Sequence, residues 1–220
     1  MRTAVFDLDG TLADTAGDLI AAANATLAEA GHGTPLDPER DRTTAFAGGR
    51  AMLVAGLARA GADEGEAEAL YPGLLDRYAD ALAVETRLYD GAEAALDRLA
   101  ADGWQLAVCT NKPERLARLL LEALGVAGRF AALLGADSLP WKKPDPRHLV
   151  ETIARAGGEA SRAALIGDTV SDREAARAAG IPCVLVGFGP EGGAVAALRP
   201  EAIVADFADL PAVLGRLVPA

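Results

Sequence analysis

Two aspartates separated by one residue follow the first apolar segment of this chain. Asp7 and Asp9 come directly after residues 4–6, and Gly10 follows them at a position suited to a sharp turn. Side chains of an extended segment alternate between its two faces, so both carboxylates are expected on the same side. Two negative charges this close repel one another unless a cation lies between them or one carboxyl keeps its proton. The pair therefore indicates catalytic or metal-binding chemistry rather than an ordinary acidic turn.

A hydroxyl and an amide follow a second apolar segment, Gln105–Cys109. Thr110 and Asn111 stand shortly before Pro113, which favours the first turn of a helix. At such a strand end both side chains can donate hydrogen bonds to phosphate oxygens. An ordinary helix cap uses the same residue types. The pair therefore indicates a phosphate site only in combination with the other motifs.

Lysine is rare in this chain, which contains only Lys112, Lys142 and Lys143. Lys143 stands before Pro144 and Pro146, and these prolines favour a rigid, extended loop. We expect the ammonium group of Lys143 to neutralise phosphoryl oxygens and to keep a neighbouring carboxylate ionised. Lys142 is expected to be a solvated surface residue.

A third acidic motif follows the apolar segment Ala163–Ile166. Asp168 comes directly after Gly167, and Asp172 follows one helical turn later. Carboxylate oxygens suit Mg²⁺, which keeps several waters and takes one or two carboxylates together with a phosphate. A hydroxyl cap at Ser171 would explain the start of a helix but not the presence of Asp168. The motif therefore predicts a magnesium site.

The segments that must position these motifs alternate between two patterns. Continuous apolar segments indicate strands covered on both faces, and helical periodicity lies between them. This alternation predicts an α/β fold, a doubly wound parallel sheet that binds ligands at the carboxyl ends of its strands. The predicted strands are Thr3–Phe6, Gln105–Cys109, Phe130–Leu134, Ala163–Ile166, Cys183–Val186 and Ala202–Val204, and the predicted helices between them are Gly91–Ala101, Pro113–Leu124, Pro146–Ala156 and Ser171–Ala179.

The segment between Asp14 and Tyr89 shows only helical pattern, and no strand is predicted there. Because this insertion directly follows the first acidic motif, we predict an α-helical cap domain at residues 15–89. Residues 1–14 and 90–220 then form the catalytic core. A helical decoration without a role in the site is the alternative. The predicted helices of the insertion are Asp18–Ala30, Gly49–Ala60 and Glu64–Val84.

Composition restricts the function classes. The 220 residues are 51% hydrophobic and carry a net charge of −11, which favours a compact protein and disfavours nucleic acid and anionic membranes as partners. Cys109 and Cys183 lie in apolar segments without the spacing of a disulfide framework or a zinc site. No segment resembles a signal peptide or a membrane span, so a cytoplasmic monomer or homodimer is expected. His32 and His148 are expected to be surface or capping residues.

The four motifs together resemble those of the haloacid dehalogenase superfamily. This resemblance implies a Rossmann-like core with an inserted cap, and it implies phosphoryl transfer, because the dehalogenases of the superfamily lack the second acid that Asp9 supplies. It also implies that Asp7 is the nucleophile, that Asp9 is the general acid and base, and that Thr110 and Lys143 hold the phosphoryl oxygens. The motifs are Asp7-Leu8-Asp9-Gly10-Thr11-Leu12, Thr110-Asn111, Lys143-Pro144 and Gly167-Asp168 with Asp172.

The metal ligands and the substrate are further implications of this resemblance. Mg²⁺ would be bound by the Asp7 carboxylate, the Asp9 backbone carbonyl and Asp168, with Asp172 acting directly or through water. The residues flanking the motifs are most similar to those of phosphoglycolate phosphatases, which implies hydrolysis of 2-phosphoglycolate to glycolate and phosphate. A small phosphorylated metabolite is thus the expected partner.

Three residues are candidates for contacts with that substrate. Asn111 is a candidate polar contact beside the second motif. Gly49 and Arg50 lie in the insertion, where a backbone amide and a guanidinium group would suit a small carboxylate. The alternative is that the glycine marks a helix break and that Arg50 is a surface residue of the next helix.

Other functions use the same set of groups. A phosphatase for a nucleotide, a sugar phosphate or pyrophosphate stays open, as does a phosphomutase of the β-phosphoglucomutase type, which excludes water while its intermediate re-orients. A phosphonate-cleaving enzyme would need a cap lysine, and residues 15–89 contain none. A non-catalytic binding protein on this fold would be expected to lack part of the motif set, which is complete here.

Overall fold

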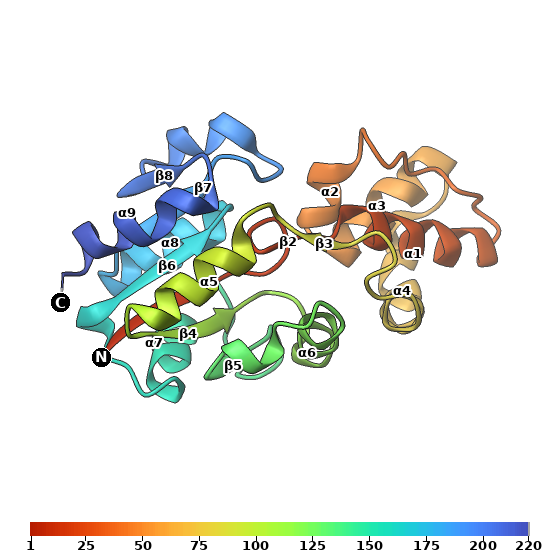
Figure 1. The fold of residues 1–220 in the computed structure, drawn as a ribbon. Coiled ribbons are helices and arrows are strands. Elements are labelled where there is room, and N and C mark those ends of the chain that lie inside the picture. The colour runs from red at the N-terminus through yellow and green to blue at the C-terminus, as the bar shows by residue number, and fades with distance from the viewer. Residues whose placement is uncertain (220) are drawn as a thin grey trace. The chain divides into compact units, whose positions relative to one another are not determined.

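The computed structural model describes residues 1–219 and divides them into two compact units (Figure 1). The first, here called the core unit, contains Met1–Ala13 and the chain from Leu88 onward. The second, here called the inserted unit, is Asp14–Arg87. Among the described residues, no helix combines the length and the apolar character that a membrane span requires.

A six-stranded sheet forms the centre of the core unit. Its strand order is β5-β4-β1-β6-β7-β8, and all neighbouring strands are parallel. This topology confirms the predicted α/β fold with a doubly wound parallel sheet, and each predicted strand overlaps an observed one. The strands are β1 (Arg2–Phe6), β4 (Trp104–Cys109), β5 (Ala132–Leu134), β6 (Ala163–Gly167), β7 (Cys183–Val186) and β8 (Ala202–Val204).

The strand order places β1 at the switch point of the sheet. The chain runs from β1 outward to β4 and β5, and then crosses to β6, β7 and β8 on the other side of β1. Because such crossovers are right-handed, the helix between β1 and β4 and the helix between β6 and β7 lie on opposite faces of the sheet, whereas the C-terminal helix packs beside the helix that precedes β4 (Figure 1). Ligands of such folds bind where the carboxyl ends of the strands diverge. The helices are α5 (Ala92–Ala101), α6 (Glu114–Ala123), α7 (Pro146–Arg155), α8 (Val170–Ala179) and α9 (Leu210–Leu217).

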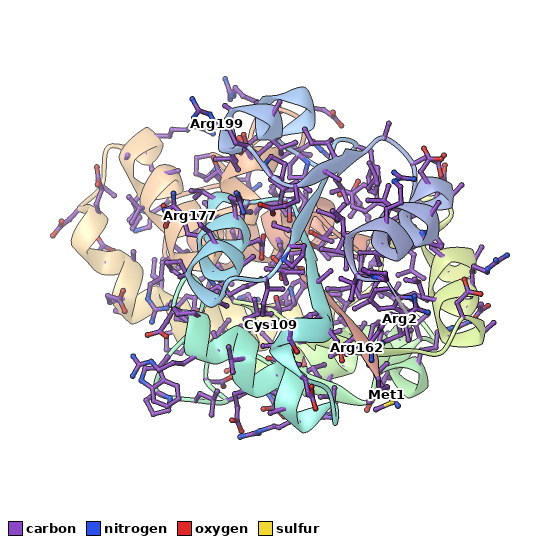
Figure 2. All side chains as sticks on the ribbon, turned by 90° about the vertical axis from the view of Figure 1, so that its left-hand side faces the viewer. Met1, Arg2, Cys109, Arg162, Arg177 and Arg199 are labelled. Carbon is purple, nitrogen blue, oxygen red and sulfur yellow. The ribbon has the colours of Figure 1, made fainter. Side chains whose placement is uncertain are left out.

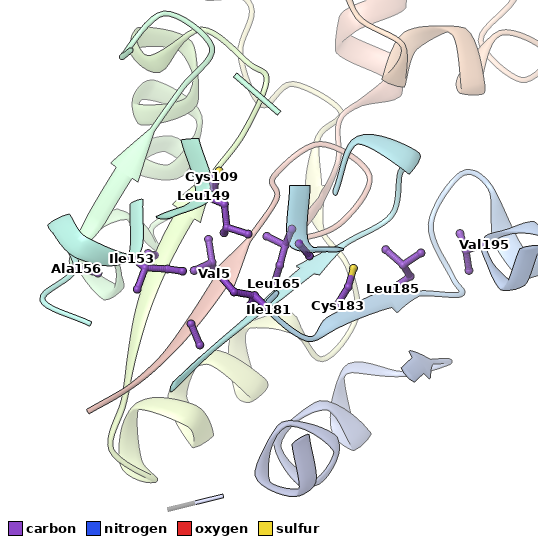
Figure 3. Packing of buried hydrophobic residues seen from close by; sticks show 13 residues of the cluster. Val5, Cys109, Leu149, Ile153, Ala156, Leu165, Ile181, Cys183, Leu185 and Val195 are labelled. Atoms are coloured by element: carbon purple, nitrogen blue, oxygen red, sulfur yellow. The ribbon is translucent and has the colours of Figure 1, made fainter. Parts of the chain in front are cut away.

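Alternate residues of the central strands pack against α7 and α8. Figure 3 shows this side of the core, where Val5 and Leu165 from the strands meet Leu149 and Ile153 from α7. Each fully buried side chain of this size contributes about 1.5–3 kcal/mol. Cys109, labelled in Figure 2, is fully buried in the same cluster. The packing holds the strands rigidly, so that the residues directly after them have fixed positions.

The inserted unit consists mainly of helices, as its sequence pattern indicates. It contains α1 (Ala16–Glu29), α2 (Arg42–Phe46), α3 (Gly49–Ala60) and α4 (Ala67–Asp80). Asp18 ties its two ends together, because the carboxylate accepts hydrogen bonds from the backbone amides of Glu85 and Thr86 at 2.9 and 3.0 Å.

The prediction of no strand between Asp14 and Tyr89 is wrong. The short strands β2 (Ala13–Asp14) and β3 (Arg87–Leu88) pair with one another where the chain passes between the two units. Strands of two residues have no hydrophobic period, so the sequence pattern cannot reveal them. The helices α2 and α9 are also absent from the sequence-based prediction.

Candidate active site

Three buried carboxylates gather at the carboxyl ends of two neighbouring strands. Asp7 follows β1, Asp168 follows β6, and Asp172 lies in the first turn of α8. One oxygen from each of them lies within 4.8 Å of the others, and all three residues are buried. The parallel pairing of β1 with β6 produces this cluster, because it places the ends of both strands side by side.

The ammonium group of Lys143 lies among these carboxylates. Its Nζ is 2.6 Å from Asp172 Oδ1 and 3.0 Å from Asp7 Oδ2, and the residue is buried. Burial disfavours the charged form of this lysine, but the negative charges of Asp172 and Asp7 outweigh it and raise the pKa of Lys143. The loop before α7 thus delivers a permanent positive charge to the end of β1, where the sequence predicts a cation beside a carboxylate.

Even with Lys143 present, the cluster contains an excess of negative charge. Burial raises the pKa of Asp7 to about 6, and the nearby charge of Asp172 adds to this effect while Lys143 opposes it. Burial also raises the pKa of Asp168 well above its ordinary value, and the negative charges of Asp172 and Asp7 raise it further. Buried carboxylates with raised pKa values favour a second positive charge in their midst.

One carboxylate oxygen of this cluster is well suited to bind a cation. Asp168 Oδ1 accepts a hydrogen bond of 2.6 Å from the hydroxyl of Thr11, whereas the buried Oδ2 has no hydrogen-bond partner among the described residues. Gly10 keeps the space beside it open, because a Cβ at that position would lie 2.5 Å from Oδ2. A hard divalent cation fits this set of oxygen donors.

Asp172 has both of its oxygens engaged. Oδ1 accepts from Lys143, and Oδ2 accepts from the backbone amide of Thr169 at 3.1 Å and from its hydroxyl at 2.6 Å. Together Thr169 and Asp172 form a capping box at the start of α8, so the hydroxyl cap lies two residues before the expected Ser171. These contacts suit a residue that holds Lys143 and the turn after β6.

Asp9 lies apart from the cluster and has a different cation. The Nζ of Lys112 is 3.0 and 3.1 Å from the two carboxylate oxygens of Asp9. Lys112 follows β4, on the opposite side of β1 from β6. Sequence reasoning assigned no role to this lysine. The rarity of lysine in the chain is the signal that could have identified it.

The second motif connects neighbouring loops. Thr110 is buried, and its Oγ1 accepts a hydrogen bond of 3.2 Å from the backbone amide of Lys112. The amide group of Asn111, expected to contact substrate, donates to the backbone carbonyl of Lys143 at 3.0 Å. Thr11, also missed by sequence reasoning, supports Asp168 as described above. The structure therefore brings the second and third motifs to the same edge of the sheet.

Comparison with known proteins agrees with this geometry. A family model described as haloacid dehalogenase-like hydrolase matches residues 4–186. The chain belongs to this family. Its resemblance to the superfamily, predicted from four short motifs, is thereby confirmed.

Relatives within the family are similar over nearly the whole chain. A phosphoglycolate phosphatase of Mesorhizobium japonicum is 43% identical over 205 residues, which cover 92% of this chain and 90% of the relative. One of Caulobacter vibrioides is 42% identical over 211 residues, which cover 95% and 89%. The crystal structure of a predicted phosphoglycolate phosphatase from Haemophilus somnus superimposes with a TM-score of 0.86, at 28% identity and 97% coverage of both chains. This member of the dehalogenase-like family is therefore a phosphoric monoester hydrolase acting on a small phosphorylated substrate.

Two predicted substrate contacts of this hydrolase lie in the inserted unit. Arg50 Nε donates to Glu68 at 2.7 Å, and the guanidinium group lies 3.7 Å from the ring centre of Tyr71. Its side chain is 53% exposed. A Cβ at Gly49 would lie 3.0 Å from the Tyr71 ring, so the start of α3 packs closely against α4. Both contacts with substrate stay predictions.

His148 is fully buried, so the expectation of a surface residue is wrong. Its Nε2 lies 3.1 Å from the carbonyl oxygen of Gly135, and its Nδ1 lies 3.4 Å from the Sγ of Cys109. Because the carbonyl can only accept, Nε2 carries the proton and Nδ1 accepts from the thiol. Burial, together with the positive charge of Lys143, lowers the pKa of His148 to about 4. The apolar periodicity of α7 places His148 on the buried face of the helix. This periodicity could have predicted its burial, but histidine is a polar residue and was therefore expected at the surface.

Proposed function

We propose that the protein is a Mg²⁺-dependent phosphatase that hydrolyses 2-phosphoglycolate to glycolate and phosphate through an aspartyl-phosphate. The observation that carries this proposal is the buried cluster of Asp7, Asp168 and Asp172 around Lys143, in which one oxygen of Asp168 has no hydrogen-bond partner within residues 1–219. The names of the curated relatives support the choice of substrate.

In the first step, Asp7 attacks phosphorus. A bond forms between a carboxylate oxygen and phosphorus while the bond from phosphorus to the ester oxygen breaks. The Leu8 amide, 2.7 Å from Asp7 Oδ1, and Lys143, 3.0 Å from Oδ2, fix the orientation of the carboxylate. Asp9 gives its proton to the departing oxygen, which leaves as the hydroxyl of glycolate.

In the second step, water releases the phosphate. Asp9, now a carboxylate, takes a proton from the attacking water, whose oxygen bonds to phosphorus while the bond from Asp7 to phosphorus breaks. Thr110 and Lys143 would hold the phosphoryl oxygens throughout. Loss of one such donor typically costs about 2.7–4 kcal/mol of transition-state stabilisation.

The acidic cluster would hold the cation. The carboxylates of Asp7 and Asp168 are two proposed ligands, and the backbone carbonyl of Asp9 is the third ligand. Asp172 would act indirectly, through Lys143 and Thr169, to which it is hydrogen-bonded. When bound, Mg²⁺ supplies positive charge that offsets the charge of the phosphoryl group and of the cluster.

The inserted unit is proposed as the cap. It interrupts the core directly after the first acidic motif, and it carries Gly49 and Arg50, which we propose as substrate contacts together with Asn111. A carboxylate is the group that a guanidinium binds best, through paired hydrogen bonds.

Phosphate release from a panel of phosphomonoesters, measured with Mg²⁺ and with chelator, tests the proposed function. We expect a preference for 2-phosphoglycolate that chelator abolishes. Metal-dependent phosphate release without preference among the phosphomonoesters would be consistent with the mechanism but would refute 2-phosphoglycolate as the specific substrate. Conversion of a sugar 1-phosphate to its isomer without phosphate release would show a mutase instead.

The role of Asp7 is tested by Asp7→Asn. The two side chains are nearly isosteric, so we expect folding to be preserved and turnover to be lost by a factor of at least about 10³. Acid quenching during turnover of a ³²P-labelled substrate should leave label on the wild type and none on the variant. A variant with nearly wild-type turnover would exclude Asp7 as the nucleophile.

A further inference from the structure

Lys112 has no role in the mechanism described above, although it lies at the carboxyl end of the sheet. Its side chain is only 4% exposed, and its Nζ contacts both oxygens of Asp9. Of the other two lysines, Lys143 holds the acidic cluster and Lys142 is exposed. A lysine is rarely buried unless its charge is paired. Asp9 supplies that pairing and so holds the ammonium group of Lys112 beside a residue of the proposed reaction.

Contacts with the residues after β5 hold the backbone of Lys112 in place. Its carbonyl oxygen accepts a hydrogen bond of 2.9 Å from the amide of Ala136, which follows β5. Gly135 approaches so closely that a Cβ there would lie 2.6 Å from the same oxygen. The backbone of Lys112 is thus held between the ends of β4 and β5.

Lys112 is also the cation beside the proposed proton donor. Lys143 is engaged by Asp7 and Asp172, on the phosphoryl side of the site. Asp9 is 20% exposed at its side chain, so the pair that it forms with Lys112 reaches the space open to a ligand. In a protein with a net charge of −11, an anionic leaving group needs a local positive charge.

The chemistry of the substrate matches this position. In the proposed reaction Asp9 lies within hydrogen-bond distance of the ester oxygen. The carboxylate of 2-phosphoglycolate is separated from that oxygen by one carbon. An ammonium group 3.0 Å from Asp9 is therefore within reach of this carboxylate as well.

We propose that Lys112 binds the carboxylate of the substrate, exchanging Asp9 for it, and so selects phosphomonoesters that carry a carboxylate one carbon from the ester oxygen. The inference rests on the proposed function, because it places the leaving group beside Asp9. When the leaving group carries a carboxylate, the charge-assisted pair of Lys112 with Asp9 is replaced by a charge-assisted pair of Lys112 with that carboxylate. A neutral leaving group offers no such exchange and leaves the pair of Asp9 and Lys112 intact.

Equilibrium binding of glycolate tests the exchange without turnover. Isothermal titration with glycolate, and with ethylene glycol as the neutral control, is carried out on the wild type, Lys112→Met and Lys142→Met. We expect Lys112→Met to weaken glycolate binding by about 10- to 100-fold. Lys142→Met, the exposed matched control, should bind as the wild type does. Near-UV circular dichroism verifies folding, and Lys112→Arg, which keeps the charge, should recover part of the affinity.

A double-mutant cycle separates direct binding from an effect through Asp9. If Asp9 and glycolate compete for Lys112, Asp9→Asn should tighten glycolate binding by about 3- to 10-fold, and the gain should vanish in the Lys112→Met background. An equal gain in both backgrounds would overturn the proposal. So would a wild type that does not bind glycolate, or a Lys112→Met variant that binds it normally. If the enzyme hydrolyses 2-phosphoglycolate and any one of these three results is found, the proposed function stands and only this inference is refuted.

Discussion

Replacing Gly10 by alanine should disable the cation site while leaving the fold intact. Gly10 has a φ of +79°, and a Cβ there would lie 2.5 Å from Asp168 Oδ2. Ordinary van der Waals contact begins at 3.4 Å, so the oxygen must move by about 0.9 Å. The carboxylate has little freedom to rotate away, because Thr11 holds its other oxygen at 2.6 Å. The displaced atom is the one without a hydrogen-bond partner among the described residues.

The effects of Gly10→Ala on stability and on activity should differ in size. A left-handed backbone costs a non-glycine residue about 1–2 kcal/mol, so we expect the free energy of unfolding to fall by about that amount. A displacement of about 1 Å in a catalytic site can reduce the rate by about 100-fold. We therefore expect kcat/KM to fall by about 100-fold.

Calorimetric titration with Mg²⁺ tests Gly10→Ala directly, since it needs no substrate. The variant should lose most of its affinity for the cation. Gly180→Ala is the matched control, because Gly180 has a φ of +67° and a Cβ there would meet no heavy atom of the described part of the chain within 4 Å. The control should lose similar stability and keep both affinity and activity. If Gly10→Ala binds Mg²⁺ as the wild type does, Asp168 Oδ2 is not a ligand.

Two further predictions concern Arg50 and His148. Arg50→Ala should raise KM for 2-phosphoglycolate but not for an uncharged aryl phosphate, and equal changes in steady-state kinetics would argue against a carboxylate contact. The unfolded chain protonates a histidine at a pKa of about 6.5, whereas burial lowers the pKa of His148 to about 4. Between these values the unfolded state binds more protons, so the contribution of His148 to stability is complete above pH 6.5 and is lost as the pH falls. The free energy of unfolding should therefore decrease by about 2 kcal/mol from pH 7 to pH 5 because of His148. Urea unfolding should show this dependence in the wild type and a flatter one in His148→Gln, and parallel curves would contradict it.

The strands were predictable because they are buried on both faces. Continuous apolar segments such as Cys183–Val186 have no polar face, and this pattern is typical of a parallel sheet covered by helices. The order of the strands was not predictable, since any apolar strand can pair with any other. The two-residue strands β2 and β3 were missed because segments this short show no hydrophobic periodicity.

The residue types of the candidate site were also predictable in part. Asp7, Asp9, Asp168 and Lys143 stand at strand or loop ends, where glycine and proline mark a change of direction. Their partners were not predictable. Asp9 and Lys112 are 103 positions apart, and only the parallel pairing of β1 with β4 brings them together.

By itself, the sequence determined the fold class, the family and the kinds of groups available for chemistry, because burial patterns and motif spacings are local properties of the chain. Only the tertiary structure decided which cation serves which carboxylate. Lys143 joins Asp7 and Asp172, Lys112 joins Asp9, and one oxygen of Asp168 stays without a partner among the described residues. The reason is physical. Pairing energies depend on distance and burial, and both are set by strand order and by the packing of loops that are far apart in the sequence.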